Sequence, residues 1–205
     1  RCSEQKIEST KKFLTKLWNV SRFLSSFPII ESADLTQTDK WIISELDKLV
    51  KDCKAGFDQY NFFIPAIAIR EFTWNVFAAH YIEMAKARAY GIGFSDAERD
   101  GAIYTLHKVL SALLKLLAPI TPYITDFLWQ TLYSTKSIHT ELQVKEESNE
   151  VMTKHTQSIS EFNSKVWNEK KEKGLSLKDS IKMEIPKELE IFKKDLVAMH
   201  NLDEN

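Results

Sequence analysis

Residues 95–132 read SDAERDGAIYTLHKVLSALLKLLAPITPYITDFLWQTL, and this stretch decides the predicted fold class. Ser95 and Glu98 have the spacing of a capping box, which marks the N-terminus of a helix. The apolar residues that follow recur at steps of three and four, the period of an α-helix, as far as Pro119. Thr121–Pro122 then has the pattern of an N-cap and first turn. Two consecutive helices with a short connection are typical of a helix bundle.

The preceding residues extend the same pattern. Helices are predicted over residues 7–25, from a capping box at residue 36 to residue 57, and from a first-turn proline at residue 65 to residue 90. The 205 residues contain only 5 Gly and 5 Pro, which also argues against a sheet. The predicted fold class is therefore mainly α: an antiparallel helix bundle over residues 1–133, with four long helices and a short fifth.

The composition changes after this bundle. Residues 134–149 are polar and charged, and we interpret them as a linker. Beyond them, residues 150–173 predict a charged helix, residues 180–185 alternate like a strand, and residues 187–200 predict a last helix. We therefore expect a small C-terminal α+β appendage over residues 150–205.

Composition and charge exclude several classes of protein. The chain is 43% hydrophobic and 28% charged, as in ordinary globular proteins. Its formal net charge of -1 gives no overall attraction for polyanions, so a nucleic-acid site must be a local basic patch. No apolar run is long enough for a membrane span and no signal-peptide pattern is present, so we expect a cytoplasmic protein without a membrane partner. Cys2 and Cys53 have neither metal-ligand nor CxxC spacing, and no metal site is expected. Because the chain begins at Arg1 and leads directly into a helix, we expect a piece of a longer protein.

The first predicted helix carries two distinct faces. Lys12, Lys16, Asn19 and Phe23 follow one another at steps of four, three and four, with Arg22 beside them. They form a ridge about 17 Å long, which we call the α1 ridge below. The opposite face carries the expected core stripe, which consists of Phe13, Leu17, Val20 and Leu24.

The ridge combines the residue types that bind an unpaired nucleotide. An aromatic ring can stack on a base, lysine and arginine can neutralise phosphates, and an asparagine amide can read a base edge. The alternative is that Phe23 packs under the following Phe27–Pro28 loop and that the lysines form a solvated face. Periodicity alone leaves both interpretations open.

Several sequence blocks resemble one known family, in the same order along the chain. These blocks are KLWNVSRF (16–23), DKWIISEL (39–46), REFTWNVFAAHYIEMAK (70–86), LHKVLSALLKLLAPITPYITDFLWQTL (106–132), FNSKVWNEKKEKGLSL (162–177) and ELEIFKKDLVAMHNL (188–202). They are similar to the anticodon-binding domain of class I aminoacyl-tRNA synthetases, most closely the archaeal-type valyl enzymes. Two departures are Ala78–Ala79, where the family often has Cys-Asp, and Ala118–Pro119 in place of His-Pro.

The resemblance implies a function. A domain of this kind binds the anticodon loop of tRNA(Val) and positions it for ATP-dependent valylation by a catalytic domain elsewhere in the same chain, which also carries an editing domain. The HIGH and KMSKS motifs are missing here, so no catalytic residue and no cofactor is expected in this stretch, whereas ATP and Mg are expected for the full-length enzyme. Expected partners are tRNA and not DNA, and the protein is expected to be monomeric.

The resemblance also assigns roles to individual residues. Lys16 matches a position that contacts the middle anticodon base, and Ile82 matches an apolar position that packs beside that base. Arg22 and Phe23 match positions that hold the third base. For Lys12 we expect a phosphate contact, and for Asn19 either an RNA contact or a bond within the bundle.

Other interpretations remain open at this point. The same bundle occurs in isoleucyl and leucyl enzymes, and a helical protein-interaction module or a helical enzyme would also fit an all-α chain, although no catalytic constellation is present. Trp41, Trp74 and Trp129 are expected to be packing residues. In the appendage, four lysines could meet phosphates or form a solvated face; they are Lys165, Lys170, Lys171 and Lys173.

Overall fold

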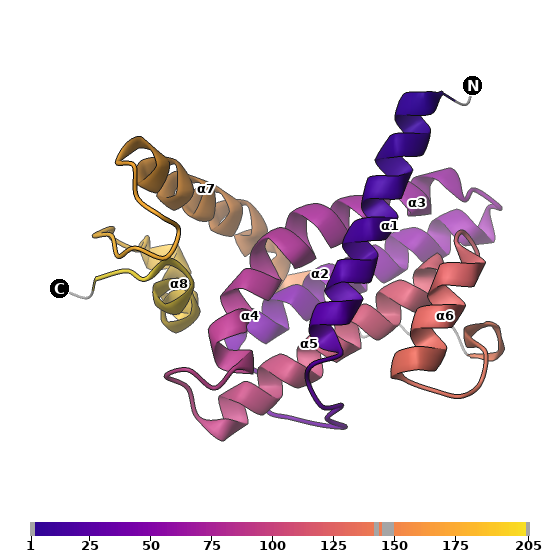
Figure 1. The fold of residues 1–205 in the computed structure, drawn as a ribbon, viewed down its shortest axis with the longest axis horizontal. Coiled ribbons are helices and arrows are strands. Elements are labelled where there is room, and N and C mark those ends of the chain that lie inside the picture. The colour runs from indigo at the N-terminus through magenta and orange to yellow at the C-terminus, as the bar shows by residue number, and fades with distance from the viewer. Residues whose placement is uncertain (1–2, 142–143, 145–149, 204–205) are drawn as a thin grey trace.

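The computed structural model describes residues 3–141, 144 and 150–203 and is mainly helical (Figure 1). The bundle contains α1 (Glu4–Leu24), α2 (Gln37–Asp58), α3 (Phe63–Glu71), α4 (Ile82–Ala89), α5 (Asp96–Leu117) and α6 (Pro122–Leu132). The prediction of a mainly α fold is confirmed. Across the described ranges, none of the helices is both long enough and apolar enough to cross a membrane.

Both predicted capping boxes are present. At the start of α5, the Ser95 backbone N–H donates to Glu98 Oε2 at 2.8 Å, and the Glu98 N–H donates to Ser95 Oγ at 3.3 Å. Thr36 and Asp39 make the same reciprocal pair at the start of α2. Thr121 does precede α6, but its hydroxyl bonds back to the Leu117 carbonyl at 3.4 Å instead of capping the new helix. Local side-chain chemistry therefore determines where two of the long helices begin.

The helix predicted from residue 65 to residue 90 is not a uniform α-helix. It runs as α3, then the π-helical segment η1 (Phe72–Tyr81), then α4, without a break in the helical backbone. Inside η1 the ring of Phe77 stacks on Phe72 at 6.3 Å and on Tyr81 at 6.0 Å between centroids. π-helical turns are rare and are frequent at functional sites. This segment faces α1, with which it is in contact.

The C-terminal part consists of the 3-10 turn η3 (Glu150–His155), α7 (Thr156–Glu172), the 3-10 turn η4 (Lys187–Phe192) and α8 (Lys193–His200). The predicted strand over residues 180–185 is wrong. Only Ile181 pairs, in one isolated bridge with Leu202, through a 3.2 Å bond from its N–H to the Asn201 carbonyl. The alternation arises because Ile181 is buried while no neighbouring strand is available to continue the ladder in the described part. Most of the predicted linker, residues 142–143 and 145–149, lies outside the described residues.

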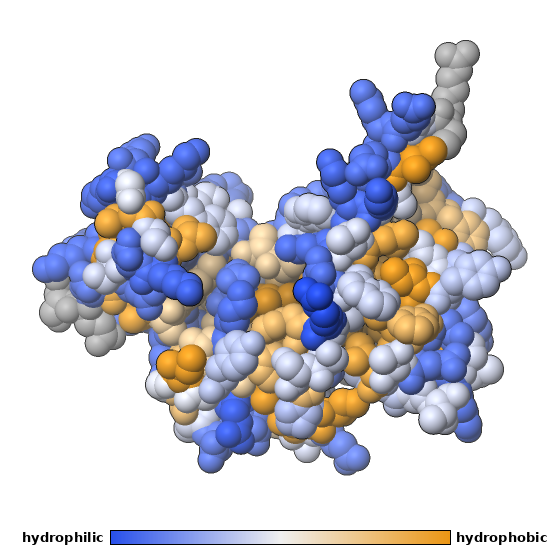
Figure 2. Space-filling model, in the orientation of Figure 1, coloured by the Kyte–Doolittle hydropathy of each residue, from blue (hydrophilic) through white to orange (hydrophobic). Residues whose placement is uncertain are grey.

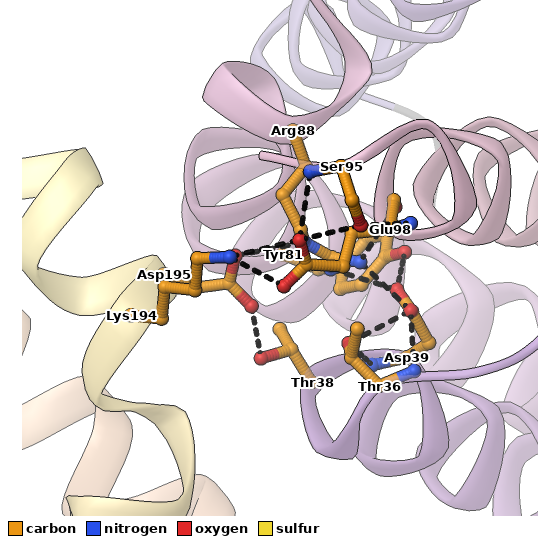
Figure 3. A network of polar contacts seen from close by, with 9 residues as sticks. All are labelled: Thr36, Thr38, Asp39, Tyr81, Arg88, Ser95, Glu98, Lys194 and Asp195. Carbon is orange, nitrogen blue, oxygen red and sulfur yellow. Dashed lines mark hydrogen bonds and ion pairs between the residues drawn. The ribbon is translucent and has the colours of Figure 1, made fainter. Parts of the chain in front are cut away.

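A buried polar network joins α8 to the bundle (Figure 3). Asp195 of α8 accepts a hydrogen bond from Arg88 Nε of α4 at 2.7 Å and one from the Thr38 hydroxyl at 2.5 Å. At the rim of the network, Lys194 Nζ lies 2.6 Å from Glu98 Oε1. This bond and the capping N–H of Ser95 lower the pKa of Glu98 to about 2. The C-terminal part is therefore held by directional bonds as well as by apolar packing.

A second polar chain crosses the same junction. His200 Nε2 lies 2.8 Å from Asn163 Oδ1, and Asn163 Nδ2 lies 3.0 Å from His80 Nδ1, so bonds pass from α8 through α7 to η1. The ring of Trp167 stacks on His80 at 5.7 Å and 10°. Burial lowers the pKa of His80, and burial with the nearby charge of Lys170 lowers that of His200 to about 4. Both imidazoles are therefore neutral at physiological pH.

Candidate nucleic-acid interface

The helix α1 lies across one face of the bundle, and its N-terminal turns extend beyond the other helices (Figure 1). The predicted core stripe is confirmed, since Leu17 and Leu24 are fully buried and Phe13 and Val20 are 6% and 5% exposed. Because one face of the helix is anchored in this way, the α1 ridge on the other face has a fixed orientation.

The α1 ridge is accessible along its whole length. Lys12, Asn19 and Arg22 are exposed, and Lys16 and Phe23 are partly buried. The structure therefore brings cationic groups, an amide and an aromatic ring together on one accessible surface, as the spacing predicted. Their roles toward individual bases remain predictions.

Phe23 takes part in a small aromatic cluster, which also contains Phe27 and Tyr90. Its ring meets Phe27 edge-on at 5.2 Å and Tyr90 at 6.3 Å between centroids. The Lys86 ammonium lies 5.8 Å from the centroid of the Phe23 ring. Phe23 thus packs on Phe27, as the alternative interpretation expected, and it also presents a ring beside a cation.

Trp74 was expected to be a packing residue, and this expectation is wrong. Its side chain is 40% exposed, whereas Trp41 and Trp129 are 0% and 7% exposed, as predicted. The reason is η1: the wider turn of a π-helix places Trp74 further round the helix from the buried Phe77 than α-helical winding would. Lys16 Nζ lies 5.7 Å from the centroid of the Trp74 ring, so this tryptophan belongs to the ridge surface.

Ile82 lies in the first turn of α4, directly after η1, and is only 6% exposed. Its neighbour Glu83 pairs with Lys86 at 2.7 Å, which confirms the ion pair expected for this helix. Ile82 therefore offers a base little more than an edge of its side chain. The aromatic residues Trp74 and Tyr90 and the cation of Lys86, which sequence analysis did not select, offer more.

An apolar groove lies between α1 and α6, away from the ridge lysines. It has a volume of about 660 Å³ and is lined by Ile7, Thr10, Lys11, Leu14, Thr15, Trp18 and Ile124. Figure 2 shows hydrophobic surface on this part of the bundle, while the C-terminal helices are largely hydrophilic. The Trp18 ring stacks on Phe127 at 5.8 Å and 17°, so it is occupied by a protein contact.

The lysines of the C-terminal part differ from one another. Lys170 cannot meet a phosphate, because its side chain is 1% exposed and its ammonium donates to the carbonyls of Leu177, Asp179 and His200 at 2.8, 2.7 and 2.7 Å. Burial lowers its pKa. Its role is to fix the loop after α7. The remaining three are exposed, although Lys173 pairs with Glu169 at 2.8 Å.

The described residues contain no cluster of three or more His, Cys, Asp or Glu side chains that could hold a metal ion. Cys53 is fully buried, and burial with the charge of Asp52 raises its pKa to about 12, so it is not a nucleophile. What the surface of α1 can do is bind a polyanion with exposed planar rings, because cations and aromatic faces alternate along it.

Comparison with known proteins agrees with this chemistry. The family model described as the anticodon-binding domain of tRNA ligase matches residues 39–185. The chain belongs to this family. The matched range contains η1, with Trp74, and α4, with Ile82, whereas α1 precedes it.

The most similar relatives include two archaeal proteins. The valine–tRNA ligase of Nanoarchaeum equitans is 36% identical over 202 residues, which are 98% of this chain and 26% of that protein. That of Aeropyrum pernix is 34% identical over 213 residues, again 98% of this chain and 26% of the relative. That of the bacterium Ehrlichia canis is 41% identical over 143 residues, 67% of this chain and 18% of the relative. The chain thus spans about a quarter or less of the length of these ligases, and the archaeal alignments extend over nearly all of it.

Proposed function

We propose that this chain recognises the anticodon loop of tRNA(Val) through the α1 ridge. The observation that carries the proposal is that a member of the anticodon-binding family presents accessible Lys12, Lys16, Asn19, Arg22 and Phe23 on one rigid helix face. Anticodon bases are single-stranded and can be splayed outward, so their recognition requires stacking rings and edge-reading groups on a firm support.

Each group on the ridge has a task in this proposal. The exposed ammonium of Lys12 binds backbone phosphate, which gives affinity without reading sequence. Lys16 and Ile82 meet the middle base, and Arg22 and Phe23 hold the third base. The Asn19 amide is free to read a base edge, because its side chain is exposed on the ridge.

We also infer a place for this chain in a larger reaction. It acts together with a catalytic domain that uses ATP and Mg to attach valine and with an editing domain, in a monomeric cytoplasmic enzyme. Residues 1–133 form the recognition bundle and residues 150–205 the appendage beyond the 134–149 linker. The exposed Lys165 and Lys171 of the appendage face the tRNA stem.

A binding experiment tests the function. The 205-residue chain is titrated with tRNA(Val), tRNA(Ile) and a tRNA(Val) carrying the isoleucine anticodon, each at two salt concentrations. Preference for tRNA(Val) that is lost on the anticodon swap supports the proposal. Equal binding of all three RNAs, with the same steep salt dependence, would reduce the surface to a general polyanion site.

A further inference from the structure

A hollow of about 270 Å³ lies between α1 and the π-helical segment η1. Its lining consists of Glu8, Lys11, Lys12, Thr15, Lys16, Asn19 and Trp74. All of these residues except Trp74 come from α1. Three lysines face one glutamate, so the hollow has a positive balance of charge. Its volume is at the small end of ligand pockets, which hold about 300–1,000 Å³, so it has room for one planar group and not for a dinucleotide.

The ring of Trp74 is available in a way that the ring of Trp18 is not. Both side chains are exposed, at 40% and 43%. Trp18 already stacks on Phe127, whereas the ring contact of Trp74 in the described part of the chain is with the Lys16 ammonium, at 5.7 Å. A flexible lysine over an exposed ring can move aside toward a phosphate while a base takes its place.

The Trp74 ring and the Phe23 ring form two similar stations. Lys16 lies over Trp74 at 5.7 Å and Lys86 lies over Phe23 at 5.8 Å. Lys16 and Phe23 are seven residues apart on α1, which corresponds to about 10.5 Å along the helix axis. Bases stacked in one strand are about 3.4 Å apart. The two stations are therefore too far apart to serve one base, and each can hold a base of its own.

We propose that Trp74 is a second base-stacking platform, which takes one unpaired RNA base in the hollow beside Lys12, Lys16 and Asn19. This inference rests on the proposed function, because it assigns a further nucleotide of the same RNA to this surface. The π-helical winding of η1 is what makes the platform, since it turns Trp74 out of the core.

The test uses the 205-residue chain and 17-nucleotide RNA hairpins with the loop sequence of a valine anticodon arm. Wild type, Trp74→Ala, Trp74→Phe and the matched control Trp18→Ala are titrated with the intact hairpin and with hairpins that lack one loop base at a time. Trp74→Ala should weaken binding about tenfold or more, and Trp74→Phe should retain most of the affinity. Trp18→Ala should bind as wild type does. One abasic position should remove the difference between wild type and Trp74→Ala, which identifies the stacked base. Thermal melts establish that each variant is folded.

The outcomes separate this inference from the proposed function. If Trp74→Ala binds every hairpin as wild type does, while the anticodon preference persists, the Trp74 platform is refuted and the proposed function stands. If wild type shows no anticodon preference but Trp74→Ala still loses affinity in a base-dependent way, the platform stands and anticodon reading fails. If wild type binds none of the hairpins, both fail.

Discussion

Arg88 and Asp39 form a buried two-pronged ion pair, in which Nη1 and Nη2 each donate to a different carboxylate oxygen at 2.8 Å. The two side chains are 1% and 0% exposed. Tyr81 donates its hydroxyl to the same carboxylate at 2.6 Å, and Asp195 takes the remaining Nε–H of Arg88. Burial by itself would lower the pKa of Arg88, but the bonds and charges of Asp39 and Asp195 outweigh it and raise the pKa. One guanidinium thus fixes α2, α4 and α8 together.

Replacing Arg88 by Met should destabilise the protein by about 3–5 kcal/mol, because two buried carboxylates would lose their counter-charge. Arg99→Ala is the matched control. Arg99 pairs with Asp96 at 2.9 Å on the surface, with a side chain that is 40% exposed, so its loss should cost about 1 kcal/mol or less. Urea unfolding of both variants measures the difference. Equal midpoints for Arg88→Met and Arg99→Ala would contradict the role given to the buried pair.

The stability should fall as the pH is lowered from about 6.5 to about 4. Folding lowers the pKa of His80 and takes that of His200 to about 4, while the unfolded value is near 6.5. The neutral imidazoles therefore contribute their full stability above pH 6.5, and this contribution is lost as the pH falls through the folded pKa values. The raised pKa of Asp195, caused by its burial, acts in the opposite direction and moderates the loss. Thermal melts across this range provide the measurement.

His200→Gln is the diagnostic variant for this pH effect. Gln can still donate to Asn163 but cannot take up a proton, so its unfolding free energy should vary less between pH 6.5 and 4 than that of wild type. A variant with the wild-type slope would place the acid sensitivity elsewhere, for example at His107, whose pKa is also lowered by burial.

Phe23→Ala should weaken binding of the valine anticodon hairpin by about 1–3 kcal/mol, because one stacking ring is removed. It should also lower the free energy of unfolding by about 1–2 kcal/mol, less than the ~3–5 kcal/mol of a fully buried phenylalanine, since Phe23 is only partly buried. Phe127→Ala is the control, an exposed ring on α6 that should affect stability slightly and RNA binding not at all. If Phe23→Ala unfolds easily and the folded fraction binds RNA normally, Phe23 is a core residue.

Lys12→Ala should weaken RNA binding to a similar extent for every loop sequence. The slope of log affinity against log salt should become shallower by about 0.7, the contribution of one phosphate contact to a single strand. Lys48→Ala, an exposed lysine of α2, should leave the slope unchanged. An effect of Lys12→Ala that differs between anticodons would instead assign base reading to Lys12.

The sequence carried much of this fold because its signals are local. Three- and four-residue spacing predicted the helices, and the reciprocal side chains at Ser95 and Thr36 predicted two helix starts. The core stripe of α1 followed from the same arithmetic. With that stripe buried, the ridge of Lys12, Lys16, Asn19, Arg22 and Phe23 had to face outward, and it does.

What the sequence did not reveal depends on long-range contacts. The apolar pattern of residues 72–81 is also that of an α-helix, so neither η1 nor the exposure of Trp74 could be read from it. Lys170 has the local context of a solvated lysine, and only the loop that folds over it supplies the three carbonyls. The Ile181 segment alternates like a strand but meets one partner residue, Leu202. An arginine so close to apolar neighbours was the one available sign of the Arg88 network.

The ten residues of η1 have a consequence for how this chain can vary in length. Each residue of an α-helix advances the rotation by about 100°, so a one-residue deletion within the segment would rewind it and swing everything downstream by about that angle. Arg88 would then point away from Asp39 while the core rings of Phe77 and Tyr81 lost their register. We therefore expect single substitutions in this segment to be tolerated far more often than single deletions, in a protein where most loops would accept either.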